Sequence, residues 1–340
     1  MLEKIFTYKN LYKAHMKTKK GKLYKREVAS FEIDYSFEIC KLYEELSKGK
    51  YRLSPYKTFY LYEPKKRKVD ATCYRDRVVQ CCLVENYLRP LLEKHLIYDN
   101  AACREDKGTD FARSRVRGFL ISLYKKHGKD FYALTFDVHH YFESIDHAIL
   151  KEKLRKVVKE EDVLFFLFMI IDSYESKPGK GLPLGNQTSQ WFALLYLDKL
   201  DRIIKERYRI KCYSRYMDDG IAFSQDKALL KNALKAIELE AMSLKLSFNE
   251  GKTAIFPIRQ GFAYLGFSYR LTESGRILSF MESKKRRRLL RHLHSLHFDS
   301  SVLLSYENYL KKRSSHHLLL LTIRKMKKER INEEAAFRRM

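Results

Sequence analysis

The chain has 340 residues, 45% of them apolar, so it can bury the core of a globular protein with two or three packed parts. Lysine and arginine number 68 against 42 acidic residues, and the formal charge of +26 favours a polyanionic partner, nucleic acid first. A basic ribosome-like protein or a membrane-surface protein would have the same charge balance. For a membrane-surface protein, however, the C-terminal helices are too uniformly charged.

Cysteine spacing and apolar runs narrow the class further. The six cysteines show neither a C-x-x-C pair nor zinc-finger spacing, so we expect no structural metal, no disulfide framework and a reducing compartment. Residues 1–15 carry charges where a signal peptide needs an apolar core. The longest apolar run, residues 163–171, is about half as long as a bilayer-spanning helix. We therefore expect a chain that does not enter a membrane.

The first hundred residues predict helices and one strand. Residues 1–60 are expected to form short helices joined by basic loops, and DYSFEICKLYEELSKG predicts one that stops at Gly49. TFYLYEP predicts a strand that ends at Pro64, followed by the basic turn KKRKV. The pattern RDRVVQCCLVENYLRPLLEKHL predicts a helix that is broken near Pro90.

The middle of the chain predicts a strand, two helices and a hairpin. FYALTFDV predicts the strand, and DHAILKEKLRKVV an amphipathic helix with Asp146 or Ser144 as its N-cap. GLPLGNQ predicts a loop, and residues 188–205 a helix that is apolar on most faces. In KCYSRYMDDGIAFS, an Asp-Gly step between two alternating apolar runs predicts a hairpin with its turn at that step.

The last part predicts an amphipathic helix in DKALLKNALKAIELEAMSLKL and a strand pair in GFAYLGFSYRL. Everything after that pair is expected to be helical and heavily basic. Because strands and helices mix without regular alternation, the pattern favours an α+β fold with an antiparallel sheet.

Three acids indicate metal chemistry. Asp218 and Asp219 are adjacent charges between apolar and aromatic residues, and Asp137 closes the strand-like run FYALTFDV. An enzyme that joins nucleotides needs two divalent cations, and magnesium prefers carboxylate oxygens as ligands. Taken alone, Asp137 is more often a turn or cap residue, and an acidic pair before glycine is often a plain hairpin turn.

Five segments in order carry a family resemblance: FDVHHYFESIDH, GLPLGNQTSQWFALLYLDKLD, RYMDDGIAFS, LSFNEGKTAIF and YLGF. The series resembles that of reverse transcriptases, which are RNA-directed DNA polymerases and nucleotidyltransferases with a right-hand fold. The match runs from roughly residue 60 to residue 270. It implies an N-terminal helical extension at residues 1–60 and fingers at residues 61–125. The palm, with part of the fingers and the antiparallel sheet, would be residues 126–267, and a small helical thumb residues 268–340.

Within this family, the chain resembles the error-prone reverse transcriptases of diversity-generating retroelements. An aliphatic residue precedes the glycine in Leu184-Gly185, and Ser189-Gln190 stands where most members have Ser-Pro. Two features depart from the subfamily: Gly220, where many relatives have phenylalanine, and the acidic segment REDKGTD. Reverse transcriptases of group II introns, retrons and phage defence remain alternatives, as does a catalytically inactive nucleic-acid-binding scaffold.

The resemblance implies a two-metal centre. Asp137, Asp218 and Asp219 would be the catalytic carboxylates and would bind two Mg²⁺ ions, with Mn²⁺ as a possible substitute. The backbone carbonyl of Val138 would be a further ligand. Because neighbouring residues of a strand point to opposite sides, we expect Asp218 to be the closer ligand.

The resemblance also implies contacts to nucleotide, template and primer. The nucleotide-binding residues would be Arg67, Lys65, Phe142, Leu184, Gly185, Gln190 and Lys252, and the primer grip Tyr264, Leu265 and Gly266. Lys66 and Lys68 flank Arg67, and which lysine reaches the nucleotide stays open. Phe142 would exclude a ribose 2′-hydroxyl, with a palm core aromatic as the alternative, whereas Tyr141 is expected to pack inward. Lys252 is equally explained as an exposed loop lysine, and Arg75 and Arg77 as template contacts or surface charges.

The implied partners are template RNA, an RNA–DNA duplex, deoxynucleoside triphosphates and a small basic accessory protein. The basic segment SKKRRRLLRHLHSLH would follow duplex phosphates as a thumb helix, and SYENYLKKRSSHH resembles a second thumb stretch. Only 73 residues follow Phe267, so no RNase H or endonuclease module is expected. Leu184 is expected to relax the checking of base pairs opposite template adenines. A cytoplasmic enzyme of a bacterium or phage fits these implications.

Overall fold

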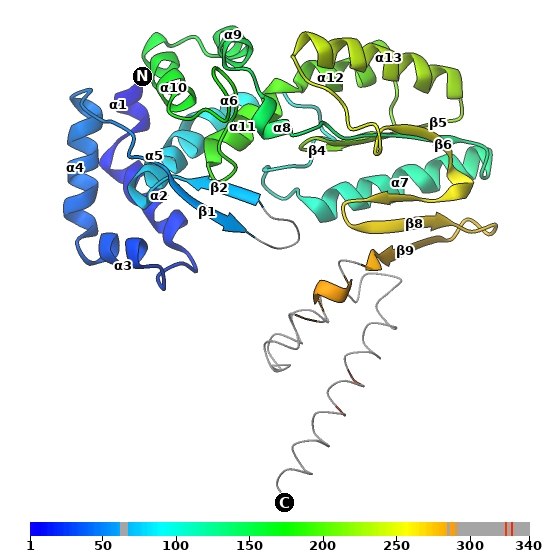
Figure 1. Cartoon of the computed structure of the whole chain (residues 1–340), viewed down its shortest axis with the longest axis horizontal. Coiled ribbons are helices and arrows are strands. Elements are labelled where there is room, and N and C mark those ends of the chain that lie inside the picture. Colours follow the sequence, from blue (N-terminus) through cyan, green and yellow to red (C-terminus); the bar gives the residue numbers. More distant parts are fainter. Residues whose placement is uncertain (62–66, 284–285, 290, 292–323, 325–327, 329–340) are drawn as a thin grey trace, which may run out of the picture. The chain divides into compact units, whose positions relative to one another are not determined.

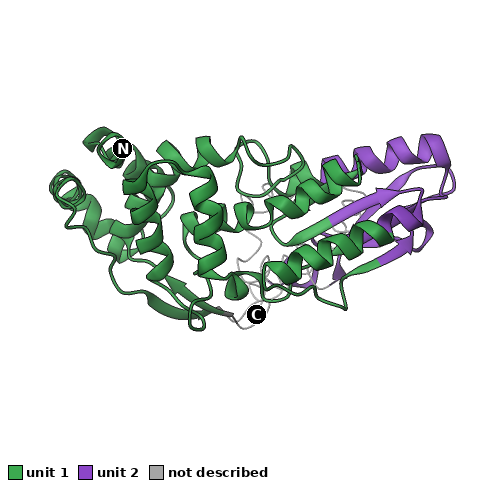
Figure 2. Cartoon of the chain, turned by 90° about the horizontal axis from the view of Figure 1, so that it is seen from above, with its two compact units in different colours: residues 1–112, 135–220, 231–254 green, residues 113–134, 221–230, 255–340 purple. Residues whose placement is uncertain are grey.

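A computed structural model describes residues 1–61, 67–283, 286–289, 291, 324 and 328 (Figure 1). The chain divides into two compact units, which Figure 2 colours green and purple. The first unit comprises residues 1–112, 135–220 and 231–254, and the second comprises residues 113–134, 221–230 and 255–340. These boundaries differ from those expected for the extension, fingers, palm and thumb, which stay predictions.

The N-terminal part of the first unit is helical, as the sequence predicts. Its helices are α1 Leu2–Ile5, α2 Tyr8–Lys19, α3 Arg26–Ile33 and α4 Tyr35–Ser47. The Thr7 hydroxyl caps α2 by accepting a hydrogen bond from the Asn10 amide at 3.2 Å. Helix α4 ends just before Gly49, whose φ of +65° suits a helix stop. Helix α2 packs against α4 and against α5, Tyr74–Leu83.

Strands β1 and β2 form an antiparallel hairpin next to these helices. Strand β1 covers Lys57–Leu61 and β2 covers Arg67–Ala71, with Thr58 opposite Asp70. The predicted strand up to Pro64 is therefore found as far as Leu61, and residues 62–66 lie outside the described residues.

The helix break predicted near Pro90 takes the form of a π-helical turn. After α5 come the π-helical segment η1 Val84–Leu88 and the short helix α6 Arg89–Leu92. Proline has no N–H to give to the helix ladder, and a wider turn before it accommodates this loss. Helices α7 Thr109–His127, α8 Tyr141–Ser144, α9 His147–Val157 and α10 Glu161–Asp172 follow.

Two further helix predictions are decided by hydrogen bonds. Asp146, and not Ser144, caps α9, because its carboxylate accepts the Ala148 and Ile149 amides at 3.1 and 3.2 Å. The single helix predicted for residues 188–205 is wrong. The chain forms α11 Gln187–Tyr196, α12 Asp198–Arg202 and the π-helical η2 Ile203–Arg207. The break is at Leu197, where the Asp198 carboxylate accepts the Lys199 amide at 2.6 Å.

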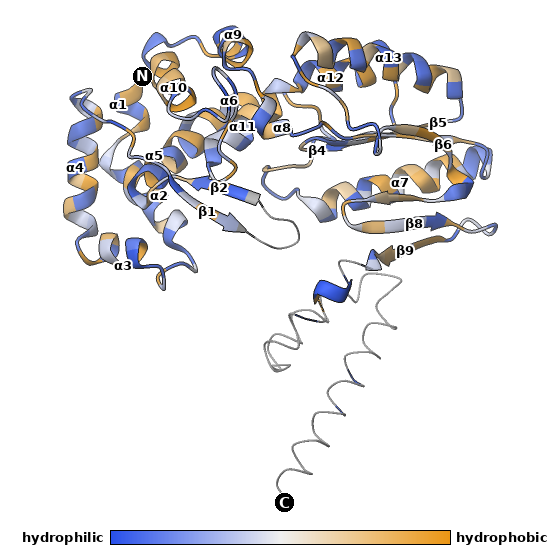
Figure 3. Ribbon diagram, in the orientation of Figure 1, coloured by the Kyte–Doolittle hydropathy of each residue, from blue (hydrophilic) through white to orange (hydrophobic). Residues whose placement is uncertain are grey.

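Apolar residues on both sides of Leu197 hide this break from the periodicity. Trp191 and Tyr196 are buried before it, and Leu200 and Ile204 after it. Figure 3 shows the concentration of apolar residues on α10 and α11.

The main sheet has the strand order β4–β5–β3–β6. Its strands are β3 Tyr132–Phe136, β4 Tyr213–Tyr216, β5 Asp219–Ser224 and β6 Ala254–Pro257. The predicted β4–β5 hairpin is confirmed, but the predicted turn position is wrong. The two turn residues are Met217, with a φ of +56°, and Asp218, whereas Asp219 and Gly220 already belong to β5. Between β5 and β6 lies the predicted helix α13, Lys227–Ser243.

A second sheet, β7–β8–β9, lies in the second unit after the short 3₁₀ helix η3, Ile258–Gln260. The predicted strand pair is β7 Phe262–Tyr264 and β8 Phe267–Leu271. Strand β9, Ile277–Met281, contradicts the expectation that everything after residue 271 is helical. Its alternating buried residues Ile277, Ser279 and Met281 are the period-2 signal of a strand.

The expected thumb helices fall largely outside the described residues. Residues 283, 286–289 and 291 are helical, and the rest of the segment 283–297 is not described, nor is any of 305–317. Within the described ranges, no helix is long and apolar enough to span a bilayer. The six cysteines are free thiols.

Candidate active site

Asp137 is the first residue after β3 and is held by a neighbouring segment. Its carbonyl accepts the Asn249 amide at 2.7 Å, and the next residue, Val138, forms an isolated bridge with Phe248. The His139 amide then donates to the Ser247 carbonyl at 2.9 Å. Strand-like pairing therefore fixes the backbone around Asp137, including Val138, whose carbonyl is the predicted further metal ligand.

The same segment brings Lys252 to Asp137. The Lys252 amide donates to the Asn249 carbonyl, and its own carbonyl accepts the Thr135 hydroxyl, both at 3.0 Å. The Lys252 Nζ lies 2.6 Å from Asp137 Oδ2. Burial alone would lower the pKa of Lys252, but the hydrogen bond to Asp137 and the nearby carboxylates raise it. Lys252 is therefore a cation of the site.

Asp218 and Asp219 lie close enough to Asp137 to interact with it. Burial raises the pKa of Asp218, and the charge of Asp137 raises it further. Burial, a side-chain hydrogen bond with Asp137 and repulsion from both other acids raise the pKa of Asp219 to about 7. The three acids that the sequence separates by about eighty positions thus meet at one place. The direct side-chain contact to Asp137 comes from Asp219, and the expectation that Asp218 is the closer metal ligand stays a prediction.

The donor set suits hard divalent cations. All three groups are carboxylates, they are buried or half-buried, and their mutual repulsion is relieved when a cation binds between them. Among the described residues, no three His, Cys, Asp or Glu side chains are already arranged as a metal site. One oxygen of Asp137 contacts the Lys252 ammonium instead. The carboxylates therefore fit Mg²⁺ by their chemistry.

Gly220 allows β5 to pack beneath the residue before Asp137. A Cβ atom at position 220 would lie 2.1 Å from Cζ of Phe136 and 2.4 Å from its Cε1. The Phe136 ring is fixed by stacking on Tyr213 at 6.2 Å between ring centroids and by Phe248 at 5.3 Å. This packing explains why the chain has glycine where many relatives of the resembled family have phenylalanine.

A buried ion pair holds the turn that carries Asp218. Arg215 and Asp201 are 0% and 1% exposed, and Arg215 Nε and Nη2 each donate to an Asp201 oxygen at 2.7 Å. Arg215 Nη1 also donates to the carbonyl of Met217, the turn residue with positive φ, at 2.6 Å. The Tyr213 hydroxyl donates to Asp201 at 2.6 Å. Such a bidentate pair fixes geometry as well as charge.

Sequence reasoning missed Arg215 and Asp201. The available signal was an arginine two residues after Tyr213 in a strand, and so on the same face as this buried side chain, together with an aspartate in the apolar stretch after α11. A charge in such a place is rarely buried unless it is paired.

The predicted nucleotide-binding residues of the first unit have different surroundings. Tyr141 is buried as expected, and Phe142 on α8 is half-buried. Leu184 and Gly185 are exposed in the loop before α11. Gln190 is half-buried, and its Oε1 accepts a hydrogen bond from the Cys103 thiol at 2.6 Å.

Among the basic residues of the predicted fingers, Arg67 begins β2. The side chain of Arg67, together with Lys65 and Lys66, lies outside what the structure describes. Lys68 is exposed and pairs with Asp70 at 3.2 Å. Arg75 pairs with Glu45, and its guanidinium carbon lies 5.4 Å from the centre of the Tyr51 ring. Arg75 therefore has a structural role within the unit.

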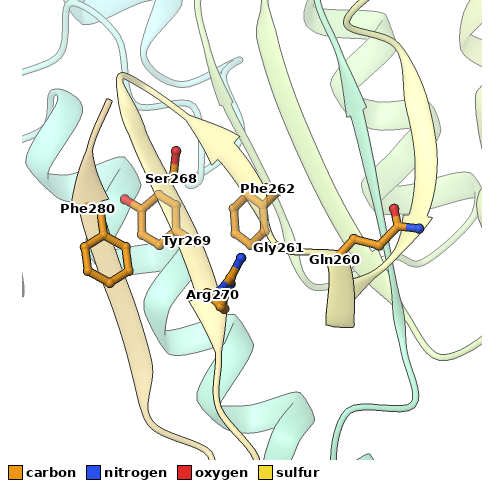
Figure 4. A pocket seen from close by; sticks show the side chains of 7 residues that line it. All are labelled: Gln260, Gly261, Phe262, Ser268, Tyr269, Arg270 and Phe280. Atoms are coloured by element: carbon orange, nitrogen blue, oxygen red, sulfur yellow. The ribbon is translucent and has the colours of Figure 1, made fainter. Parts of the chain in front are cut away.

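The predicted primer grip lies in the second unit. Tyr264 ends β7 and is buried, and Leu265 and Gly266 form the turn to β8 with φ of +47° and +78°. The Arg113 guanidinium donates to the Leu265 carbonyl at 3.3 Å. A cavity of about 430 Å³ lies on the same sheet. The residues that line it include Phe262, Arg270 and Phe280 (Figure 4). No carboxylate lines it, so it offers no metal chemistry.

Residues 63–269 match the family model described as "Reverse transcriptase (RNA-dependent DNA polymerase)". The chain belongs to the reverse transcriptase family. The description of the family model gives RNA-dependent DNA polymerase as the family's activity. A search of curated proteins gave no match.

Solved telomerase structures share the fold of this reverse transcriptase. Apo telomerase of Candida tropicalis is 14% identical, with a TM-score of 0.52. The alignment covers 75% of this chain and 54% of the telomerase chain. A version of this telomerase truncated from the C-terminal domain is also 14% identical, with a TM-score of 0.51. The alignment covers 69% of this chain and 58% of the telomerase chain. Telomerase of Candida albicans, in complex with a fragment of telomeric RNA, is 12% identical, with a TM-score of 0.51. The alignment covers 70% of this chain and 47% of the telomerase chain. The chain thus spans about half the length of these proteins, and the expected right-hand polymerase fold is confirmed.

Proposed function

We propose that this protein copies an RNA template into cDNA by two-metal nucleotidyl transfer. The observation that carries the proposal is the meeting of Asp137, Asp218 and Asp219, with Lys252 in contact with Asp137. Two Mg²⁺ ions bound there would activate the primer 3′-hydroxyl and stabilise the charge on the leaving pyrophosphate. Mn²⁺, which also accepts carboxylate ligands, would substitute.

Each protein group has a defined task in this proposal. The three carboxylates hold the cations, and the Val138 carbonyl is a further ligand. Lys252 is a positive charge beside the carboxylates, placed to stabilise or protonate the leaving pyrophosphate. The ring of Phe142 excludes a ribose 2′-hydroxyl, which selects deoxynucleotides. Arg67 and Lys65 bind the triphosphate, and Tyr264, Leu265 and Gly266 position the primer strand.

Gly185 supports a substrate contact at the loop before α11. A Cβ at position 185 would make only ordinary contacts of 3.7 Å with Asp70 and Ala71, and Gly185 is not among the residues with positive φ. Neither the fold's packing nor its backbone conformation therefore requires glycine there. We infer that glycine is used because the nascent base pair approaches the backbone, with Leu184 and Gln190 beside it.

The proposed substrates are template RNA, the RNA–DNA duplex and deoxynucleoside triphosphates, with a small basic accessory protein as a further partner. Leu184-Gly185 and Ser189-Gln190 support an error-prone enzyme of a bacterial or phage diversity-generating retroelement. The expected fingers, palm and thumb are part of the same proposal.

Primer extension tests the catalytic proposal. Wild-type protein with Mg²⁺ should extend a DNA primer on an RNA template, with and without the small basic product of a neighbouring gene. Asp218→Asn keeps the side-chain size, removes the charge, and should abolish extension while the protein remains folded. Equal extension by both proteins would refute the metal centre, and sequencing of the cDNA would show whether errors concentrate at template adenines.

A further inference from the structure

A basic pocket lies between α2, α5 and the start of α11, all within the first unit. Its volume is about 250 Å³, and the residues that line it include Lys17, Lys22, Arg77, Gln80, Gly185 and Gln187. Two lysines come from the N-terminal helical part, and Arg77 and Gln80 come from α5. We call it the α2–α5 pocket.

Two buried N–H groups of this pocket have no hydrogen-bond partner in the described part of the chain. They are Nε of Arg77 and Nε2 of Gln80, and Gln80 is only 1% exposed. The orientation of Gln80 is fixed, because its Oε1 accepts the Thr188 hydroxyl at 3.0 Å. A buried donor without a partner destabilises the folded protein, so a ligand that accepts both hydrogen bonds would be stabilised there.

The charges around these donors select an anion. Lys22 Nζ donates only to a backbone carbonyl, that of Thr18, at 3.2 Å in the described contacts. Lys17 Nζ pairs with Glu85 at 2.7 Å, and Glu85 does not line the pocket. Lys22 and Arg77 therefore face the pocket without an acidic side chain among the lining residues. Several N–H donors and two cations around a small cavity match a phosphate group.

We propose that the α2–α5 pocket binds a backbone phosphate of the template RNA. This inference rests on the proposed function, because it uses the template contact expected at Leu184 and Gly185. Gly185 lines the same pocket as Arg77 and Gln80. When a template base forms its pair at the loop of Gly185, the neighbouring backbone phosphate is therefore within reach of Arg77 and Gln80. The N-terminal helical part thereby becomes a component of the template path, through Lys17 and Lys22.

Single-phosphate neutralisation tests this inference. RNA templates annealed to a DNA primer would carry one neutral methylphosphonate at successive positions of the single-stranded overhang, and their affinity for the full chain would be measured. At one position wild-type protein should lose about tenfold in affinity, and Lys22→Ala should lose about tenfold on unmodified RNA but be insensitive to that methylphosphonate. Lys13→Ala, exposed on α2 and not lining the pocket, is the matched control and should respond to methylphosphonates as wild type does.

Gln80→Glu gives an independent readout. It keeps the acceptor for Thr188 and places a carboxylate beside Arg77 and Lys22. If the pocket is an anion site, this variant should melt at the same or a higher temperature than wild type and bind overhang RNA at least tenfold more weakly. A clear loss of thermal stability would oppose the inference, because a buried charge without compensation destabilises.

The sources of phosphate are separated by competition. The template assignment would be overturned by two results together. Inorganic phosphate or a deoxynucleoside triphosphate would protect wild type, and not Lys22→Ala, against heat unfolding, and no methylphosphonate position in the template would change the affinity. Affinity of blunt primer–template duplex should be the same for wild type and Lys22→Ala. Failure of the proposed polymerase would appear separately, as absence of extension by wild type at saturating RNA.

Discussion

The ring of Phe136 fills the space that a side chain at position 220 would need, with Cζ 2.1 Å from the place of a Cβ. This pair joins the residue before Asp137 to the residue after Asp219. The neighbours of two of the three carboxylates are therefore packed against each other, at the end of β3 and the start of β5.

Gly220→Ala should push Phe136 away and separate Asp219 from Asp137. Overpacking of this kind costs about 1–3 kcal/mol of unfolding free energy, and we expect primer extension to fall by more than the stability loss explains. Addition of Phe136→Leu to Gly220→Ala should restore part of the unfolding free energy and part of the primer extension. The control is Gly118→Ala in α7, where nothing lies within 4 Å of the added carbon. Wild-type extension by Gly220→Ala would contradict this packing argument.

Lys252→Met should change the metal requirement as well as the rate. Without the ammonium 2.6 Å from Asp137, the carboxylates attract cations more strongly, so the Mg²⁺ concentration for half-maximal extension should decrease. Turnover should decrease by about a hundredfold if the ammonium assists the leaving group. A magnesium titration of both proteins measures both effects. If only folding is affected, the half-maximal Mg²⁺ concentration will stay unchanged.

Arg215→Met should destabilise the first unit strongly. It leaves Asp201, which is 1% exposed, as a buried carboxylate without its main partner, at a cost of about 3–5 kcal/mol. Urea unfolding measures this loss. The comparison is Lys156→Met, which removes the exposed Lys156–Glu152 pair and should leave stability unchanged. Addition of Asp201→Leu to Arg215→Met should recover part of the loss, and no recovery would count against the pairing as its cause.

Below neutral pH, His15 should make stability fall. The ring is fully buried, with Nε2 2.9 Å from Glu32 and Nδ1 2.9 Å from the Tyr74 hydroxyl. Burial lowers the pKa of His15 despite the opposing effect of Glu32. The folded pKa is then below the unfolded value of about 6.5, so this contribution is complete above pH 6.5 and is lost as pH falls toward the folded pKa.

Urea unfolding of wild type and His15→Gln between pH 5 and pH 8 measures this contribution, which changes by at most about 1.4 kcal/mol per pH unit. The difference between the two proteins isolates His15 from the other titrating groups. A difference that is constant across this range would show that His15 does not titrate in the folded protein as expected.

Leu184→Gln tests the proposed origin of infidelity. Leu184 is 37% exposed in the loop before α11, so the exchange should not affect folding. Adding a polar contact beside the nascent pair should lower misincorporation opposite template adenines. Sequenced cDNA from both proteins measures it, and an unchanged error spectrum would exclude this explanation.

Elements with one clear periodicity could be predicted from sequence. The amphipathic helices α9 and α13 and the hairpin β7–β8 appear where the pattern places them, and the hairpin β4–β5 appears with its turn two residues earlier than predicted. Asp137 was expected at the end of a strand, and it directly follows β3. These features depend on neighbours in sequence, which is the information that a pattern contains.

Tertiary contacts decided what the pattern could not. The Asp-Gly step resembles a turn, but Gly220 is needed inside β5 because Phe136 occupies its side-chain space. The break at Leu197 is hidden because buried residues lie on both sides of it. For Arg215, its long-range partner Asp201 and its bond to Met217 became visible only when the chain was folded. The contacts of the α2–α5 pocket likewise join segments that are distant in sequence.

Strand β4 is at the end of the order β4–β5–β3–β6, and its outer edge is already occupied. The Arg215 amide donates to the Asp99 carbonyl at 3.2 Å, and the Arg215 carbonyl accepts the Ala101 amide at 2.9 Å. An open edge at this place could recruit a strand of another molecule and start intermolecular aggregation. The short segment 99–101 therefore shields the hairpin that carries Asp218 and Asp219 from such association, and a deletion there should reduce the yield of monodisperse protein.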